Sequence, residues 1–214
     1  SQVDSSIGGK TGVDFDAYKN MVGAFHMPKL VYANLSTLLS LPLEQFTSGM
    51  GEVVKHGLIK NGDYYEWLKD NRGRIMNREL DICQAMVLES CRIKREVVEL
   101  DPTEKGDRAL LNFGHTLGHA VEKLEHFTMY HGHCVGLGCI AAARISQLKG
   151  FLNEEEAADI EHTFRSFGTP EKDLGLSWEE VLKAAQSDKK TEAGVIRFVL
   201  LKAIGQAVVD SNVT

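Results

Sequence analysis

Histidines gather in one stretch of this chain, in the sequence N-F-G-H-T-L-G-H over residues 112–119 and again at His131 and His133. His115 and His119 are four residues apart in a helix-like apolar run, so both imidazoles should project from one helical face. Neutral imidazole is a common ligand of catalytic transition metals, and two on one face can combine a ligand with a proton shuttle. The stretch suggests a metal-dependent enzyme, and a core helix with two hydrogen-bonded histidines is the alternative.

The composition is that of an ordinary soluble globular protein. The 214 residues are 43% hydrophobic and 25% charged, and the net charge of −6 offers no general field that attracts nucleic acid. An anionic substrate must therefore be held by a local cluster of lysines and arginines. No stretch reaches 18 apolar residues, so we expect no membrane partner. The four cysteines form no C-x-x-C pair, which indicates buried thiols in a reducing compartment and predicts a cytoplasmic protein.

A glycine-rich loop opens the chain. Glycines at positions 8, 9 and 12 permit tight backbone turns, and Lys10 and Thr11 between them offer donors to an oxyanion. The loop is not a P-loop, because the residues before Gly-Lys-Thr do not fit that motif. Residues 29–35 then read as a short buried strand, although no partner strand is evident nearby.

From residue 37 onward the hydrophobic period is helical. Pro42 marks a helix start, Asn61-Gly62-Asp63 ends the first long helix, and Asp101-Pro102 ends the second. The small residues within 132–148 favour close helix packing rather than a membrane span, since Arg144 interrupts the run. The expected helices cover residues 43–59, 64–70, 77–100, 108–124, 132–148, 153–167 and 177–185.

Strand patterns return at the end of the chain. Residues 195–201 and 207–209 flank Ala203-Ile204-Gly205 and predict a β-hairpin. The predicted fold class is therefore mainly α, a multi-helix bundle with small β elements at both ends. We expect residues 1–36 to form a substrate loop and strand. Residues 37–214 should form a helical metal- and substrate-binding domain that ends in the hairpin.

Several segments, taken in order, resemble the 3-dehydroquinate synthase family. They are V-D-S-S-I-G-G-K-T-G at 3–12, Lys19-Asn20, G-E-V-V-K at 51–55, L-L-N-F-G-H-T at 110–116 and Asp188-Lys189-Lys190. The resemblance covers essentially the whole chain and implies the helical fold of that family. Its full-length members carry an N-terminal Rossmann-like NAD-binding domain before the helical domain. No G-x-G-x-x-G after a strand occurs in this sequence, so residues 1–36 are expected to be what remains of that first domain.

The resemblance implies a phosphate-eliminating lyase of the shikimate pathway, which leads to aromatic amino acids. The family converts 3-deoxy-D-arabino-heptulosonate 7-phosphate, a phosphorylated keto acid, to 3-dehydroquinate and phosphate. NAD+ oxidises a secondary alcohol, phosphate leaves, NADH returns the hydride, and an intramolecular aldol step closes the ring. Such a route needs a Lewis acid, here Zn2+ or Co2+, and cations for the phosphate and carboxylate. The family is typically dimeric, which predicts a homodimer.

The family match assigns roles to the acidic and imidazole side chains. Glu52, His115 and His131 are implied as the protein ligands of the metal, and one carboxylate with two imidazoles is a sound catalytic zinc set. His119 is implied as a proton shuttle that faces the phosphate. Glu104, in the loop before the histidine motif, is implied as the second acid or base.

The sequence departs from the family beside the third metal ligand. The family usually has His-Gly-Glu where this chain has His-Gly-His at 131–133, so an imidazole replaces a carboxylate near the site. His133 is therefore the rival of His131 as a ligand. Taken without the family, Glu52 fits a helix-surface salt bridge with Lys55 or His56 about as well as a metal site.

Substrate-binding positions follow from the same match. Arginine grips a carboxylate with two hydrogen bonds, whereas lysine acts as a movable charge for phosphate. Lys94 lies mid-helix and Arg108 at a helix start, where neither charge favours the helix, and this favours a ligand role. Lys10 and Lys19 are also implied to contact the cofactor, NAD+. The implied substrate-binding residues are Asp4, Lys10, Lys19, Asn20, Lys55, Lys94, Arg108, Asn112, Lys189 and Lys190.

Three other functions remain open at this point. Other sugar-phosphate cyclases would keep most of the same metal and phosphate residues. Metal-dependent glycerol and alcohol dehydrogenases share the architecture more distantly, but the glycine-lysine loop and the 112–119 motif favour phosphate elimination. A non-catalytic metal-binding or oligomer-forming module is the third alternative. We expect little activity from this chain alone and substantial activity together with a dinucleotide-binding domain.

Overall fold

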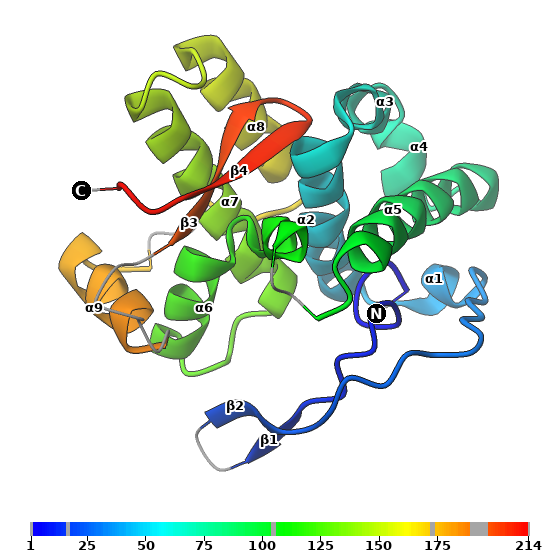
Figure 1. Ribbon diagram of the computed structural model, residues 1–214. Coiled ribbons are helices and arrows are strands. Elements are labelled where there is room, and N and C mark those ends of the chain that lie inside the picture. Colours follow the sequence, from blue (N-terminus) through cyan, green and yellow to red (C-terminus); the bar gives the residue numbers. More distant parts are fainter. Residues whose placement is uncertain (1, 16–17, 104–105, 172–173, 189–196, 214) are drawn as a thin grey trace.

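The computed structural model describes residues 2–15, 18–103, 106–171, 174–188 and 197–213, with the backbone alone for 14–15, 18–21 and 187–188 (Figure 1). Over these residues the fold is mainly α-helical, with a two-stranded antiparallel sheet near each end of the chain, which confirms the predicted fold class. The helices are α1 (Thr37–Ser40), α2 (Leu43–Lys60), α3 (Gly62–Asp70), α4 (Arg72–Met76), α5 (Leu80–Leu100), the 3-10 helix Asp107–Asn112, α6 (His115–Leu124), α7 (His131–Leu148), α8 (Glu154–Ser166) and α9 (Trp178–Asp188).

Helix α2 forms the centre of the molecule. It packs against α3, α5 and α7, and every residue from Met50 to Ile59 is buried. An amphipathic surface helix would bury one stripe only, so α2 is a core helix that nevertheless carries Glu52, Lys55 and His56. Charged and polar groups in such a place need partners or a ligand, because burial removes their hydration.

Helix α7 packs closely on α6 and α2. Its small residues Gly136, Gly138, Ala142 and Ala143 are buried, as the sequence predicted. At Gly138 a Cβ atom would lie only 1.9 Å from the carbonyl oxygen of Gly114, so the start of α6 touches the backbone of α7. The close packing holds the two histidine-bearing helices in a fixed relation.

The C-terminal hairpin forms as predicted, from β3 (Phe198–Ala203) and β4 (Gln206–Asp210). Strand β3 packs on α7, and Figure 1 shows the hairpin beside α7. All four cysteines are unpaired, and Cys83, Cys134 and Cys139 are buried, in agreement with the expectation of reduced thiols. Among the described residues no helix is both long and apolar enough to cross a membrane.

The predicted strand at 29–35 does not form. The segment has no regular secondary structure and pairs with no strand of the described chain, and Leu30 and Tyr32 are each 83% exposed. A strand needs a neighbour to satisfy its backbone, and none lies beside it here. The hairpin near this end instead joins β1 (Val13–Phe15) to β2 (Tyr18–Val22), which the sequence did not predict.

The helix predicted for residues 108–124 is interrupted. A 3-10 helix ends at Asn112 and α6 begins at His115, because Gly114 between them has a left-handed φ of 78°. A side chain at this position would be strained and would also meet Sγ of Cys139 at 2.4 Å. The short helix α4 was not expected either, and the boundary between residues 36 and 37 stays a prediction.

Candidate metal and substrate site

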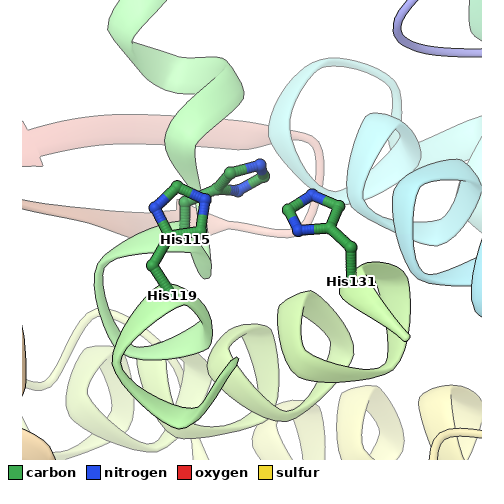
Figure 2. A group of neighbouring side chains, drawn as sticks. All are labelled: His115, His119 and His131. Atoms are coloured by element: carbon green, nitrogen blue, oxygen red, sulfur yellow. The ribbon is translucent and has the colours of Figure 1, made fainter. Parts of the chain in front are cut away.

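Three histidines converge where α6 meets the start of α7. Figure 2 shows the rings of His115 and His119 on α6 turned toward the ring of His131, the first residue of α7. The ring centroids lie 5.2 Å apart for His115 and His119, and 5.6 and 5.7 Å from that of His131. The predicted sharing of one helical face by His115 and His119 is therefore correct.

Close contact between α2 and α7 brings a carboxylate to the same place. A Cβ atom on Gly51 would lie 2.1 Å from the carbonyl oxygen of Gly132, and one on Gly132 would lie 1.8 Å from that of Ser48. Only glycine allows the two helix backbones to approach this closely. The residues that follow and precede these glycines, Glu52 and His131, are thereby placed face to face.

Glu52 is buried, and its two carboxylate oxygens have different surroundings. Oε2 accepts a hydrogen bond from the ammonium group of Lys55. Oε1 lies 3.6 Å from Nε2 of His115 and 3.5 Å from Nε2 of His131, and it has no hydrogen-bond partner in the described part of the chain. A buried carboxylate oxygen without a partner is costly, so something else is expected to satisfy it.

The spacing of these three atoms fits a metal ion. Two ligands that each lie about 2.1 Å from one tetrahedral ion are about 3.4 Å apart. The separations of 3.5 and 3.6 Å are close to that value and longer than a normal charge-assisted hydrogen bond. Glu52, His115 and His131 together form a carboxylate and imidazole set that suits Zn2+ or Co2+.

The protonation of the three groups is set by their surroundings. Burial opposes ionisation of Glu52, but the Lys55 ammonium together with His131 and His115 outweighs burial and holds the pKa of Glu52 well below its usual range. Burial and the Lys55 charge lower the pKa of His115 to about 3, so its ring is neutral. The Nδ1 atom of His115 lies 3.2 Å from the carbonyl oxygen of Phe113, which leaves Nε2 directed at Glu52.

His131 is the more exposed ligand, with 43% of its side-chain surface accessible. Burial of the ring disfavours its charge, but the hydrogen bond to Glu122 and the charge of Glu52 outweigh that effect and raise the pKa of His131 to about 9. In the metal-free protein this ring is therefore protonated at neutral pH. A metal ion must replace the proton on Nε2.

His119 completes a second possible set of ligands. Nitrogen atoms of His115, His119 and His131 lie within 4.8 Å of one another. The lack of a partner for Glu52 Oε1 favours Glu52 as the third ligand over His119. The role of His119 as a proton shuttle stays a prediction.

Cationic side chains surround the other side of Glu52. On α5, the buried Lys94 donates to Oδ1 of Asp4 at 2.5 Å, and burial lowers the pKa of Lys94. Ligand atoms of Asp4, Glu52 and His56 lie within 4.8 Å of one another. The ion pair of Lys94 with Asp4 therefore lies next to the ion pair of Lys55 with Glu52. The arrangement assembles alternating charges from the N-terminal loop, α2 and α5 in one place.

Arg108 fixes the N-terminal loop. Its guanidinium group donates to the carbonyl oxygens of Pro102 and Gly8, both at 2.6 Å, and lies over the ring of Phe25. The hydroxyl group of Thr11 donates to the Ala24 carbonyl oxygen, so it ties the hairpin rather than pointing to an oxyanion as expected. Substrate contact by Arg108 stays a prediction.

The remaining predicted residues lie in the 3-10 helix, in the N-terminal loop and hairpin, or outside the described residues. Asn112 is half-buried at the end of the 3-10 helix, and Lys10 is exposed and bridges to Phe25 through its backbone. The side chains of Lys19 and Asn20 lie outside the described residues, although their backbone belongs to β2. Three further predicted residues also lie outside the described residues: Glu104, Lys189 and Lys190.

Two residues near the site, Glu122 and His56, were given no role in it from the sequence. Glu122 is buried beside His131 and shares the face of α6 with His115, a spacing visible in the sequence. His56 is fully buried, and neither ring nitrogen has a hydrogen-bond partner in the described chain. Burial lowers the pKa of His56 to about 4. His133, the rival ligand, points elsewhere, with Nε2 at 3.0 Å from Oγ1 of Thr47 on α2.

Curated relatives and solved structures resemble the chain over most of its length. It is 44% identical over 224 residues to the 3-dehydroquinate synthase of Symbiobacterium thermophilum, covering 100% of this chain and 60% of the relative. It is 40% identical over 209 residues to that of Acetivibrio thermocellus, covering 97% and 58%. The chain thus spans about 60% of the length of these relatives.

The fold is that of sugar-phosphate cyclases. A 2-epi-5-epi-valiolone synthase from Streptomyces hygroscopicus, solved with NAD+ and Zn2+, matches with a TM-score of 0.91 and 23% identity, over 100% of this chain and 60% of that one. A 2-deoxy-scyllo-inosose synthase, solved with carbaglucose-6-phosphate, NAD+ and Co2+, matches with a TM-score of 0.81 and 24% identity, over 97% and 58%.

Two family models account for nearly the whole chain. The model described as 3-dehydroquinate synthase N-terminal matches residues 1–48, and the model described as 3-dehydroquinate synthase C-terminal matches residues 49–191. The second match alone covers more than half of the chain, so the chain belongs to the 3-dehydroquinate synthase family.

Proposed function

We propose that this chain carries the metal- and substrate-binding part of a 3-dehydroquinate synthase. The complete reaction would convert 3-deoxy-D-arabino-heptulosonate 7-phosphate to 3-dehydroquinate and phosphate, with NAD+ and with Zn2+ or Co2+. A small phosphorylated keto acid is then the substrate, and a homodimer in the cytoplasm is the expected working form. The relatives near 40% identity favour this reaction over those of the more distant cyclases.

One observation carries the proposal. Glu52 Oε1 is buried without a hydrogen-bond partner among the described residues and lies between the Nε2 atoms of two histidines. Glu52, His115 and His131 would hold the ion, which when bound polarises substrate oxygens as a Lewis acid. The same positions were assigned as ligands from the family motifs, and the comparisons place the chain in that family.

The chain's own residues supply binding and proton transfer. Lys55 and Lys94 are buried cations paired with Glu52 and Asp4 beside the proposed metal ligands, and their charges would attract an anionic substrate. His119, next to His115 on the same helix face, is placed to take or give a proton at a substrate oxygen. Arg108 holds the glycine-rich loop against this group of residues.

Phosphate release from the heptulosonate substrate tests the proposal. With NAD+ and Zn2+ present, we expect little release by the 214-residue chain alone. We expect substantial release when it is combined, in one fusion protein, with the part of the Symbiobacterium thermophilum relative that this chain does not match. The same fusion with Glu52→Ala is the control, and a panel of other sugar phosphates tests the cyclase alternatives. A metal-loaded, folded fusion that releases no phosphate would contradict the proposal, and rapid turnover by the chain alone would contradict the division into two parts.

A further inference from the structure

A second buried carboxylate, that of Glu122, contacts the His131 ring on the side opposite Glu52. Glu122 lies near the end of α6, is only 4% exposed, and places Oε2 at 3.3 Å from Nδ1 of His131. The carbonyl oxygen of Glu122 also accepts a hydrogen bond from the amide of Phe127, at 2.9 Å, where the chain leaves α6. The backbone position of Glu122 is therefore fixed, and its side chain reaches across to the first residue of α7.

The ring of His131 lies between two carboxylates. Its Nδ1 atom faces Glu122, while its Nε2 atom faces Glu52 Oε1 at 3.5 Å. An ionised carboxylate only accepts hydrogen bonds, so Nδ1 must be the donor to Glu122. That contact fixes which nitrogen carries the hydrogen and how the ring is turned. The lone pair of Nε2 is then the one available to an ion beside Glu52.

His115 is held in a corresponding way. Its Nδ1 atom lies 3.2 Å from the backbone carbonyl oxygen of Phe113, and its Nε2 atom also faces Glu52. Both rings are thus oriented through Nδ1, one by a backbone group and the other by a side chain. Partners of this kind orient metal-bound imidazoles and raise their basicity.

We propose that Glu122 is a positioning residue that orients His131 for metal binding. The inference rests on the proposed metal site but concerns a residue that none of the site assignments above includes. A role only as a link between α6 and α7 is the alternative. The two roles differ in what they predict for metal affinity in a protein that remains folded.

Co2+ affinity and the visible absorption spectrum of bound Co2+ distinguish the two roles. In the 214-residue chain we expect Glu122→Ala to weaken Co2+ binding about 10- to 100-fold and to change the spectrum. Glu122→Gln keeps an oxygen that accepts a hydrogen bond from Nδ1. Its loss of Co2+ affinity should therefore be smaller than that of Glu122→Ala, but still about threefold or more. Thermal unfolding of the metal-free proteins shows whether each variant is folded, and Glu122→Gln carries the test if Glu122→Ala is not.

Asp159→Ala is the matched control. Asp159 also links two helices, because its carboxylate accepts hydrogen bonds from Tyr65 and Lys69 of α3, but it lies outside the metal site. We expect it to lower thermal stability and leave Co2+ affinity unchanged. Wild-type affinity and spectrum in a folded Glu122→Ala protein, or in Glu122→Gln if Glu122→Ala does not fold, would overturn the proposal. A wild-type chain that binds no Co2+ would instead overturn the metal site itself, and the Glu122 role with it.

Discussion

Glu52 and His115 face each other across 3.6 Å, from Oε1 to Nε2, although they lie on different helices. The positions of three glycines create this relationship. The glycine contacts of Gly51 and Gly132 bring α2 against α7, and the left-handed Gly114 starts α6 at His115. The buried Oε1 atom has no hydrogen-bond partner in the described chain, which favours an ion at this point.

Metal binding should release a proton from His131. The pKa of His131 is raised to about 9, so this ring is protonated at pH 7, whereas that of His115, lowered to about 3, is already neutral. Zn2+ affinity should therefore rise by up to about tenfold per pH unit until the pH passes about 9. Calorimetry in buffers of different ionisation enthalpy should give about one proton released at pH 7 and nearly none above pH 10. Proton release that is independent of pH would contradict this expectation.

Gly51→Ala should destabilise the protein. The added Cβ atom would lie 2.1 Å from the carbonyl oxygen of Gly132, and the helices must separate to accept it. Overpacking of this kind costs about 1–3 kcal/mol in the free energy of unfolding, which urea denaturation measures. Gly49→Ala, on the same helix with nothing within 4 Å, is the control and should be neutral or slightly stabilising. Equal stability of the two variants would refute the close approach of α2 and α7.

Lys55→Met should destabilise the metal-free protein, because it leaves Glu52 buried without its ion pair. Removal of one partner from a buried pair costs about 3–5 kcal/mol. Zn2+ should recover part of this loss by supplying a new positive charge beside the carboxylate. Unfolding measured with and without Zn2+ tests both statements. A Lys55→Met protein as stable as the wild type without metal would contradict the buried ion pair.

His133→Ala should leave the metal site intact. The ring of His133 lies 3.0 Å from Thr47 Oγ1 and so belongs to the contact between α7 and α2. We expect a loss of about 1 kcal/mol in the free energy of unfolding and a Zn2+ affinity within about twofold of the wild type. Isothermal titration and urea denaturation measure the two quantities. A large loss of affinity with little change in stability would instead make His133 the ligand.

The helical part of the fold was predictable from the sequence because its signals are local. Hydrophobic period and helix-ending residues located α2 and α5 closely, and the small residues of α7 indicated its tight packing. The motif around His115 contributed to the family resemblance from which Glu52, His115 and His131 were predicted as metal ligands. These features depend on neighbours a few residues apart along the chain.

The sequence could not predict what depends on distant neighbours. Residues 29–35 have the apolar pattern of a strand, but pairing requires a second strand that the described chain does not offer. Gly114 interrupts a helix because α7 lies against it, and this contact appears only after folding. Likewise His131-Gly132-His133 did not reveal which histidine faces Glu52, since that depends on where α2 lies.

Zn2+ stoichiometry of single alanine variants is the most direct test of the metal site. Purified chains of Glu52→Ala, His115→Ala, His131→Ala, His119→Ala and His133→Ala would be loaded with Zn2+, dialysed and measured by elemental analysis. We expect one ion per chain in the wild type, His119→Ala and His133→Ala proteins, and little in the other three. Retention of the ion by His131→Ala together with its loss from His133→Ala, or retention by Glu52→Ala together with loss from His119→Ala, would contradict the assignment.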